Sequence, residues 1–211
     1  LEHDPYSISY NKISTIYEDS RGTIWAGTRG GGLNSLQRKD IISGKFTHYV
    51  HQPGDPESLG NDHVYAIFED NKGTLWIGTN KGGLNRLDPD NKRFIRYQNS
   101  PQNPFSLADN DIRSIIQDHT GLIWVGTFGG GISKFDPSSE RFGLVQHEPG
   151  NPNSLSEGNV WALLKDRAGL LWIGVESGLD RHDTFTDQYH HFRHDPNDPQ
   201  SISDSDVRSL Y

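Results

Sequence analysis

The stretch Asp70–Asp88, "DNKGTLWIGTNKGGLNRLD", occurs four times in the chain with small changes. The copies that begin at positions 19, 118 and 166 read "DSRGTIWAGTRGGGLNSLQ", "DHTGLIWVGTFGGGISKFD" and "DRAGLLWIGVESGLDRHD". The tryptophans of successive copies are 51, 48 and 48 residues apart. A fixed period of tens of residues is typical of a repeat architecture, so this stretch decides the fold.

Each unit contains four strand-like runs. In the second unit they are "VYAIFED", "TLWIGT", "GGLNRLD" and "RFIRYQ". The runs are rich in β-branched, aromatic and aliphatic residues and are bounded by Gly, Asn, Asp or Pro. The D-x-x-G step predicts a hairpin, because Asp can hydrogen-bond its own turn and Gly tolerates a positive φ. Four antiparallel strands repeated at this period form one blade of a β-propeller.

The second strand of each unit, "LWIGT" in the second, is apolar on both faces. A sheet with one wet face would alternate instead, so neighbouring blades must cover both faces. A glycine in this strand leaves room for a side chain of the next blade. These glycines are Gly27, Gly78, Gly126 and Gly174.

The sequence therefore predicts an all-β protein, a β-propeller with about four four-stranded antiparallel blades plus the first strand of a fifth. We expect one propeller segment over 1–211. The blades are expected at about 12–50, 63–98, 111–147 and 159–194, with the start of the next blade at 206–211.

Composition excludes several classes of function. The net charge of −8 disfavours a nucleic-acid backbone or an anionic membrane as the partner. The chain has no cysteine, which excludes thiol chemistry and disulfides. It also has no methionine, and Leu1 falls inside a repeat, so we expect a piece of a longer protein.

The repeat follows the pattern V-x-x-I-x-x-D-x-x-G-x-[LI]-W-[IV]-G-T-x-x-G-G-[LI], with a linker P-x-x-P-x-S-[LI]. This pattern resembles the two-component regulator propeller repeat. The resemblance holds over residues 13–33, 64–84, 112–132 and, with one residue missing, 160–179.

The resemblance implies the sensor region of bacterial histidine kinases, hybrid regulators and some diguanylate cyclases. It implies an extracytoplasmic, periplasmic location. We therefore expect a non-enzymatic segment that senses a ligand or a protein and passes the signal to a kinase or cyclase domain outside this chain. The expected partners are a small molecule or carbohydrate and either further blades or a second copy of the chain. We expect no nucleic acid, no membrane insertion of this segment and no cofactor.

Candidate ligand-binding residues lie where the four units differ, because the shared positions already have a folding explanation. Three candidates follow the threonine-like position, in a loop: Arg29, Phe128 and Glu176. Three others stand second in the first strand: Tyr65, Arg113 and Trp161. Aromatic and guanidinium groups together suit a sugar or an anionic small molecule. The alternative for the strand residues is packing between blades. For the loop residues it is simple solvation or contact with a neighbouring domain outside this chain.

One histidine-rich stretch is a candidate for metal binding. In "YHHFRHD", His190, His191, His194 and Asp195 carry the right atoms for zinc. Adjacent histidines on a strand point to opposite faces, however, so we predict an exposed outer strand and no metal site.

The enzyme alternative is a propeller lyase or hydrolase. It would use His147 and Glu148 with Glu176 as a base and a metal-binding carboxylate, but nothing in their spacing requires this. We therefore predict no catalytic residues. A second alternative is a purely structural or partner-docking propeller, which would expose an apolar rim and have no small-molecule pocket.

Overall fold

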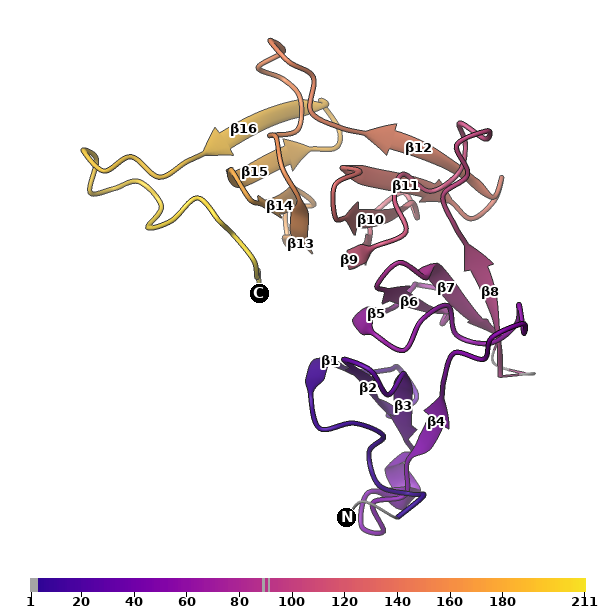
Figure 1. Cartoon of the computed structure of the whole chain (residues 1–211). Helices are drawn as coiled ribbons and strands as arrows, with labels where there is room; N and C mark the ends of the chain where they lie inside the picture. Colours follow the sequence, from indigo (N-terminus) through magenta and orange to yellow (C-terminus); the bar gives the residue numbers. More distant parts are fainter. Residues whose placement is uncertain (1–3, 89, 91) are drawn as a thin grey trace. The chain divides into compact units, whose positions relative to one another are not determined.

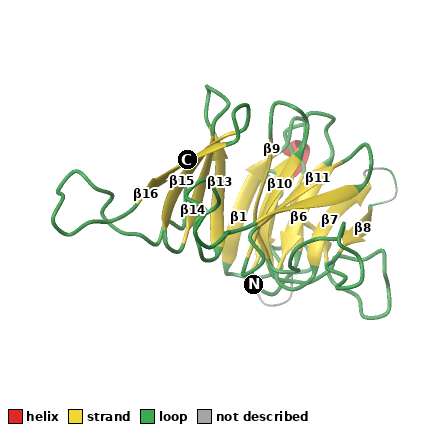
Figure 2. Cartoon of the chain, turned by 90° about the horizontal axis from the view of Figure 1, so that it is seen from above, coloured by secondary structure: helices red, strands yellow, loops and turns green. Residues whose placement is uncertain are grey.

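The computed structural model describes residues 4–88, 90 and 92–211. Its strands form four separate antiparallel sheets of four strands each, and in every sheet the strands follow one another in chain order (Figure 1). Loops connect the sheets. A short 3-10 helix, Arg38–Asp40, lies in the insertion that lengthens the first sequence repeat (Figure 2). No helix in the described part of the chain is long and apolar enough to cross a membrane.

The sixteen strands of the described residues fall into four blades. Blade 1 consists of β1 (Ile13–Glu18), β2 (Ile24–Thr28), β3 (Leu33–Leu36) and β4 (Thr47–Tyr49). Blade 2 consists of β5 (Val64–Glu69), β6 (Leu75–Thr79), β7 (Gly83–Asp88) and β8 (Arg93–Tyr97). Blade 3 consists of β9 (Ile112–Gln117), β10 (Ile123–Thr127), β11 (Ile132–Asp136) and β12 (Arg141–Val145). Blade 4 consists of β13 (Val160–Lys165), β14 (Leu171–Val175), β15 (Gly178–Asp183) and β16 (Gln188–Phe192).

This arrangement confirms the predicted all-β fold and its four blades. The chain divides into two compact units. The first contains residues up to Gln98 together with Asn110–Ile112, and so holds blades 1 and 2. The second contains Asn99–Asp109 and Arg113–Tyr211, with blades 3 and 4. That the whole chain forms one propeller segment stays a prediction.

Residues 206–211, where the sequence predicts the start of a fifth blade, form no strand in the structure, so the fifth blade stays a prediction. In each blade the first strand pairs with the second strand of the same sheet, and the described residues hold no second strand for this segment. Val207 still lies against Gly174, and its N–H donates to the Val175 carbonyl at 3.1 Å.

The D-x-x-G turns have the same hydrogen bonds in all four blades. In blade 3, one carboxylate oxygen of Asp118 accepts the N–H groups of Thr120 and Leu122, and the other accepts the Trp124 indole N–H at 2.7 Å. The other three indole bonds, from Trp25, Trp76 and Trp172, are 2.8 to 2.9 Å long. The repeated Asp and Trp therefore close one turn together, and their repetition is structural.

The glycine of each second strand packs as predicted. A Cβ on Gly27 would lie 2.7 Å from Val64 of the following blade, and one on Gly126 would lie 2.7 Å from Val160. Gly78 meets Ile112 in the same way, at 2.6 Å. Close approach of neighbouring blades thus depends on the missing side chain.

Two apolar cores follow from this packing. One joins blades 1 and 2 around Trp25, Leu33, Ile77 and Phe94. The other joins blades 3 and 4 around Trp124, Ile132, Val160 and Ile173. Each core belongs to one of the two compact units, and each unit buries what a single blade would leave exposed.

Candidate functional site

The second residue of the first strand lies in a β-bulge. The pairing register shifts between Val64 and Ala66 in blade 2 and between Val160 and Ala162 in blade 4, so Tyr65 and Trp161 are the extra residues. A bulge leaves one residue out of the ladder and redirects its side chain. These positions were chosen in the sequence because they vary between repeats. In the structure their side chains are redirected by the bulge.

Three of the predicted site residues meet in the second unit. The guanidinium carbon of Arg113 is 5.0 Å from the ring centre of Phe128 and 5.5 Å from that of Trp161. The two rings are themselves 5.5 Å apart and tilted by 58°. Phe128 is 41% exposed, so the group reaches the surface.

A second guanidinium completes this group. Arg208 lies 5.3 Å from the Trp161 ring, and its Nε donates to Asp206 at 2.7 Å. The hydrogen bond that Arg208 donates to Asp206 is the main reason why the pKa of Arg208 is raised. We call Arg113, Phe128, Trp161 and Arg208 the Arg–Trp cluster. Two cations lie against the Trp161 indole, and its buried Nε1 has no hydrogen-bond partner among the described residues. Such a group favours an anionic or polar ligand.

Glu176 stands beside the cluster and has a structural role. Its carboxylate accepts a hydrogen bond from the Asn159 side chain at 2.8 Å, and its N–H donates to the Asn159 carbonyl. Glu176 also acts electrostatically on Arg208. It therefore fixes the loop before β13 and balances part of the positive charge.

The other two predicted residues belong to the first unit. Arg29 is exposed and forms a backbone bridge with His63, while its N–H donates to the Lys12 carbonyl at 2.9 Å. Tyr65 is half-buried on β5. Their part in ligand binding stays a prediction.

The histidines of the linkers are structural. His147 Nδ1 lies 2.9 Å from the Leu155 carbonyl, which locks the linker between blades 3 and 4. His51, Asn99 and His194 contact the corresponding carbonyls of the other linkers at 2.7 to 2.9 Å. His147 thus repeats a contact that His51 and His194 also make, which gives it a structural role in its linker.

A Ser–His–Asp group occurs in blade 4 but lacks the geometry of a catalytic triad. Asp180 is fully buried and accepts the Ser156 N–H and hydroxyl, each at 2.7 Å. His191 Nδ1 faces both Asp180 and Ser156, at 2.7 and 3.1 Å, and its Nε2 contacts the Pro152 carbonyl. A relay needs the acid and the nucleophile on different ring nitrogens, so this group holds the linker instead. Among the described residues, no group of three or more His, Asp or Glu could hold a metal ion.

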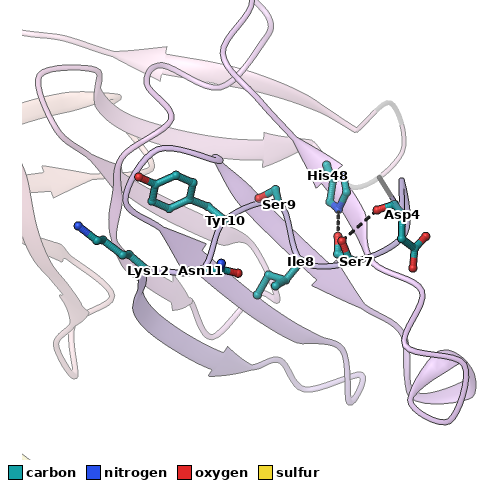
Figure 3. A pocket seen from close by; sticks show the side chains of 8 residues that line it. All are labelled: Asp4, Ser7, Ile8, Ser9, Tyr10, Asn11, Lys12 and His48. Carbon is teal, nitrogen blue, oxygen red and sulfur yellow. Dashed lines mark hydrogen bonds between the residues drawn. The ribbon is translucent and has the colours of Figure 1, made fainter. Parts of the chain in front are cut away.

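A cleft of about 720 Å³ lies in the first unit beside the segment that leads into β1 (Figure 3). Two of its polar side chains bind the backbone of neighbouring residues. His48 Nε2 contacts the Ser7 carbonyl at 2.7 Å, and Ser9 donates through its hydroxyl to the Gly31 carbonyl. The cleft is therefore the surface of a linker that is fastened to its blade.

Four repeated four-stranded antiparallel blades, packed through their second-strand glycines, define a β-propeller. Four stretches of the chain match the model of the two component regulator propeller family, at residues 7–30, 58–81, 106–129 and 154–177. The match confirms the resemblance seen in the sequence.

Solved structures give the same result. The chain is 26% identical to a domain named as the extracellular domain of the hybrid two component system BT3049 from B. thetaiotaomicron, with a TM-score of 0.78 over 98% of this chain and 27% of that one. For the corresponding domain of BT4673 from B. thetaiotaomicron the identity is 26% and the TM-score 0.72, over 93% of this chain and 26% of that one. The chain thus spans about a quarter of the length of these domains.

More distant structures share the fold alone. Virginiamycin B lyase from Staphylococcus aureus is 16% identical, with a TM-score of 0.63 over 92% of this chain and 58% of that one. Among curated proteins, no sequence matches the chain.

Sequence reasoning missed Arg208 as a member of the cluster. It stands one residue after Val207, as Trp161 stands one residue after Val160, so the repeat itself carried the signal. Arg113, Trp161 and Arg208 thus occupy the same position in three successive repeats. Phe128, from the β10–β11 turn, completes the cluster.

Proposed function

We propose that this chain is a non-enzymatic, ligand-sensing propeller segment of a bacterial extracytoplasmic signal-transduction receptor. The Arg–Trp cluster binds a sugar or an anionic small molecule, and binding biases a conformational equilibrium that a kinase or cyclase domain outside this chain reads. The extracellular domains of two-component systems at 26% identity support the location and the class of receptor.

The observation that carries the proposal is the contact of Arg113 and Arg208 with the same indole, Trp161. Guanidinium groups bind carboxylates, phosphates and sulfates through paired hydrogen bonds, and an indole face stacks on a sugar ring. His147 repeats a contact found in other linkers, and the Asp180 group lacks the geometry of a triad, so neither favours the lyase or hydrolase alternative.

The test is calorimetric titration of the chain with glucuronate, an anionic sugar, and with glucose. Removal of the Arg113 charge in the variant Arg113→Gln should weaken glucuronate binding by about tenfold or more, because hydrogen bonds to charged groups are worth about 1.5–3 kcal/mol. Arg21→Gln, on an exposed turn of the first unit, serves as the control and should bind as the wild-type chain does. Equal affinities in all three proteins would make the cluster a packing feature and contradict the proposal.

A further partner is favoured by one specific observation, the uncovered first strand of blade 1. Ile13 is 38% exposed and Ile16 is 69% exposed, whereas Val64 and Ile67 at the same positions of blade 2 are 0% and 8% exposed. In blade 2 these positions pack against blade 1. We propose that a further blade or a second copy of the chain covers this face of blade 1.

A further inference from the structure

A cleft of about 270 Å³ lies between blades 3 and 4 in the second unit, away from the residues of the Arg–Trp cluster. Trp124 of β10 lines it, with Val145 of β12, His182 of β15 and Tyr189 of β16. Sites for drug-sized ligands begin at about 300 Å³, so this cleft suits a smaller molecule.

Comparison of the blades explains why the cleft exists. In three blades the fourth strand places an aromatic ring against the repeated tryptophan. Trp25 and Tyr49 are 5.7 Å apart between ring centres, Trp76 and Tyr97 are 6.0 Å apart, and Trp172 and Phe192 are 5.7 Å apart.

In blade 3 the register places Val145 at the aromatic position, opposite Ile132 as Tyr49 is opposite Leu33. The shorter side chain leaves space beside Trp124. The cleft therefore has the position that an aromatic ring fills in the other three blades.

A second difference between the blades, a histidine in place of an apolar residue, adds a polar group to the cleft. The cross-strand partner of the first residue of the second strand is Leu36, Leu87 and Phe135 in blades 1 to 3, but His182 in blade 4. The His182 side chain is 3% exposed, its Nε2 lies 2.8 Å from Asp187, and its Nδ1 has no hydrogen-bond partner among the described residues. Because the carboxylate accepts from Nε2, the neutral ring has an acceptor at Nδ1.

Three aromatic rings and several polar side chains line the cleft. The His182 ring stacks on Tyr189 at 4.3 Å and lies 5.6 Å from Trp124. Burial, together with the nearby Asp187 and Asp180, raises the pKa of Tyr189, so its hydroxyl stays protonated. Lys134 lies over Trp124 at 4.5 Å. In blade 4, Trp172 contacts both Arg181 and Phe192, so a cation and a ring can share one indole.

We propose that this cleft is a second ligand site, which binds a small molecule with a single aromatic ring and a hydroxyl group, a phenol. The ring takes the place of the missing tyrosine beside Trp124. The hydroxyl donates to His182 Nδ1, which is buried in the free chain, once the His182 ring turns to expose this atom. This inference does not depend on the Arg–Trp cluster.

The experiment uses p-cresol as the probe, with binding measured by saturation-transfer NMR and calorimetry on the whole chain. We expect p-cresol to bind in the millimolar range or tighter. 4-Methylcyclohexanol has a similar shape but no π-system and should bind about fivefold more weakly, since aromatic pairs contribute about 0.5–1.5 kcal/mol beyond burial.

The decisive variant is Val145→Tyr, which restores the aromatic pair found in blades 1 and 2. It should abolish p-cresol binding without lowering Tm. Val50→Tyr places the same new side chain at an exposed position of blade 1 and should bind p-cresol as the wild-type chain does.

A second variant tests the polar contact. His182→Phe copies the residue of blade 3 and should weaken p-cresol binding by about tenfold, because it removes one hydrogen bond. If Val145→Tyr does not fold, this variant decides the matter. The proposal is overturned if the wild-type chain does not bind p-cresol at millimolar concentration, if the cyclohexanol binds equally well, or if both variants bind p-cresol unchanged.

Discussion

At the scale of single residues, the pairing of Asp with Trp in each turn is the most informative feature. The carboxylate of Asp118 is buried, and burial alone would raise its pKa. Hydrogen bonds from Thr120, the Trp124 indole and two backbone N–H groups outweigh burial and hold the pKa below its ordinary value. The folded state thus favours the ionised form of this group.

This shift predicts a pH dependence of stability. A carboxyl whose folded pKa is depressed stabilises the protein above the unfolded pKa of about 3.9, and the stabilisation is lost as the pH falls through the folded pKa. Asp118→Asn should therefore lower Tm at pH 7 by roughly 3–8 °C, and the difference from wild type should shrink below about pH 4.

Thermal unfolding at pH 7, 5 and 3 measures this effect. The control is Asp136→Asn, because Asp136 accepts bonds from Ser138 and Ser139 in an exposed turn and should matter less. A Tm difference for Asp118→Asn that is independent of pH would assign the effect to packing around Trp124 instead.

At the scale of the structural element, the second strand depends on its glycine. A Cβ on Gly126 would lie 2.4 Å from the Ser114 hydroxyl and 2.7 Å from Val160 of the next blade. Both neighbours belong to strands packed in the core, so neither can move freely. The strand therefore tolerates no side chain at this position.

Gly126→Ala should destabilise the chain by roughly 1–3 kcal/mol, the usual cost of overpacking a core, and lower Tm by roughly 3–10 °C. Gly143→Ala is the matched control. On β12 an added Cβ meets a single atom, the Lys134 carbonyl oxygen at 3.9 Å, so Tm should be nearly unchanged. The packing argument fails if the two variants have the same Tm.

The elements were predictable from the sequence because each has a local cause. Turns follow from D-x-x-G, and the covered faces follow from apolar residues on both sides of "LWIGT". The β-bulges at Tyr65 and Trp161 were not predictable, since a bulge depends on the register of a partner strand.

The cleft beside Trp124 was not predicted either, although the sequence contains the residue differences that produce it. Alignment of the four units places Val145 with Tyr49 and Tyr97, and His182 with Leu36 and Leu87. Sequence reasoning examined residues that differ on loops and first strands. The informative differences lay at core positions, where a small or polar residue replaces a large apolar one.

At the scale of the whole molecule, the first strand of blade 1 is the main uncovered apolar face identified. Ile16 on this strand is 69% exposed, although its equivalents Ile67, Ile115 and Leu163 are 6 to 8% exposed. Exposed apolar surface of this kind favours association. We therefore expect this face to bind another copy of the chain when no further blade covers it.

The chain should show a mass that rises with concentration in light scattering. Ile16→Glu places a charge on the face and should keep the chain monomeric over the same range. Ile42→Glu changes an isoleucine that is fully exposed in the insertion of blade 1, and it should associate as wild type does. If Ile16→Glu and wild type give the same mass at every concentration, association does not use this face.

The contact of Val207 with Gly174 limits how such an assembly can grow. The hollow on β14 corresponds to the hollows that receive Val64 and Val160, but it is already filled by the chain's own residues. A second copy cannot insert its first strand there without displacing this segment. Head-to-tail addition, which would produce open fibres, is therefore disfavoured. Pairing of two identical blade 1 faces about a two-fold axis would stop at two molecules, so we expect Val207 to limit association to a dimer.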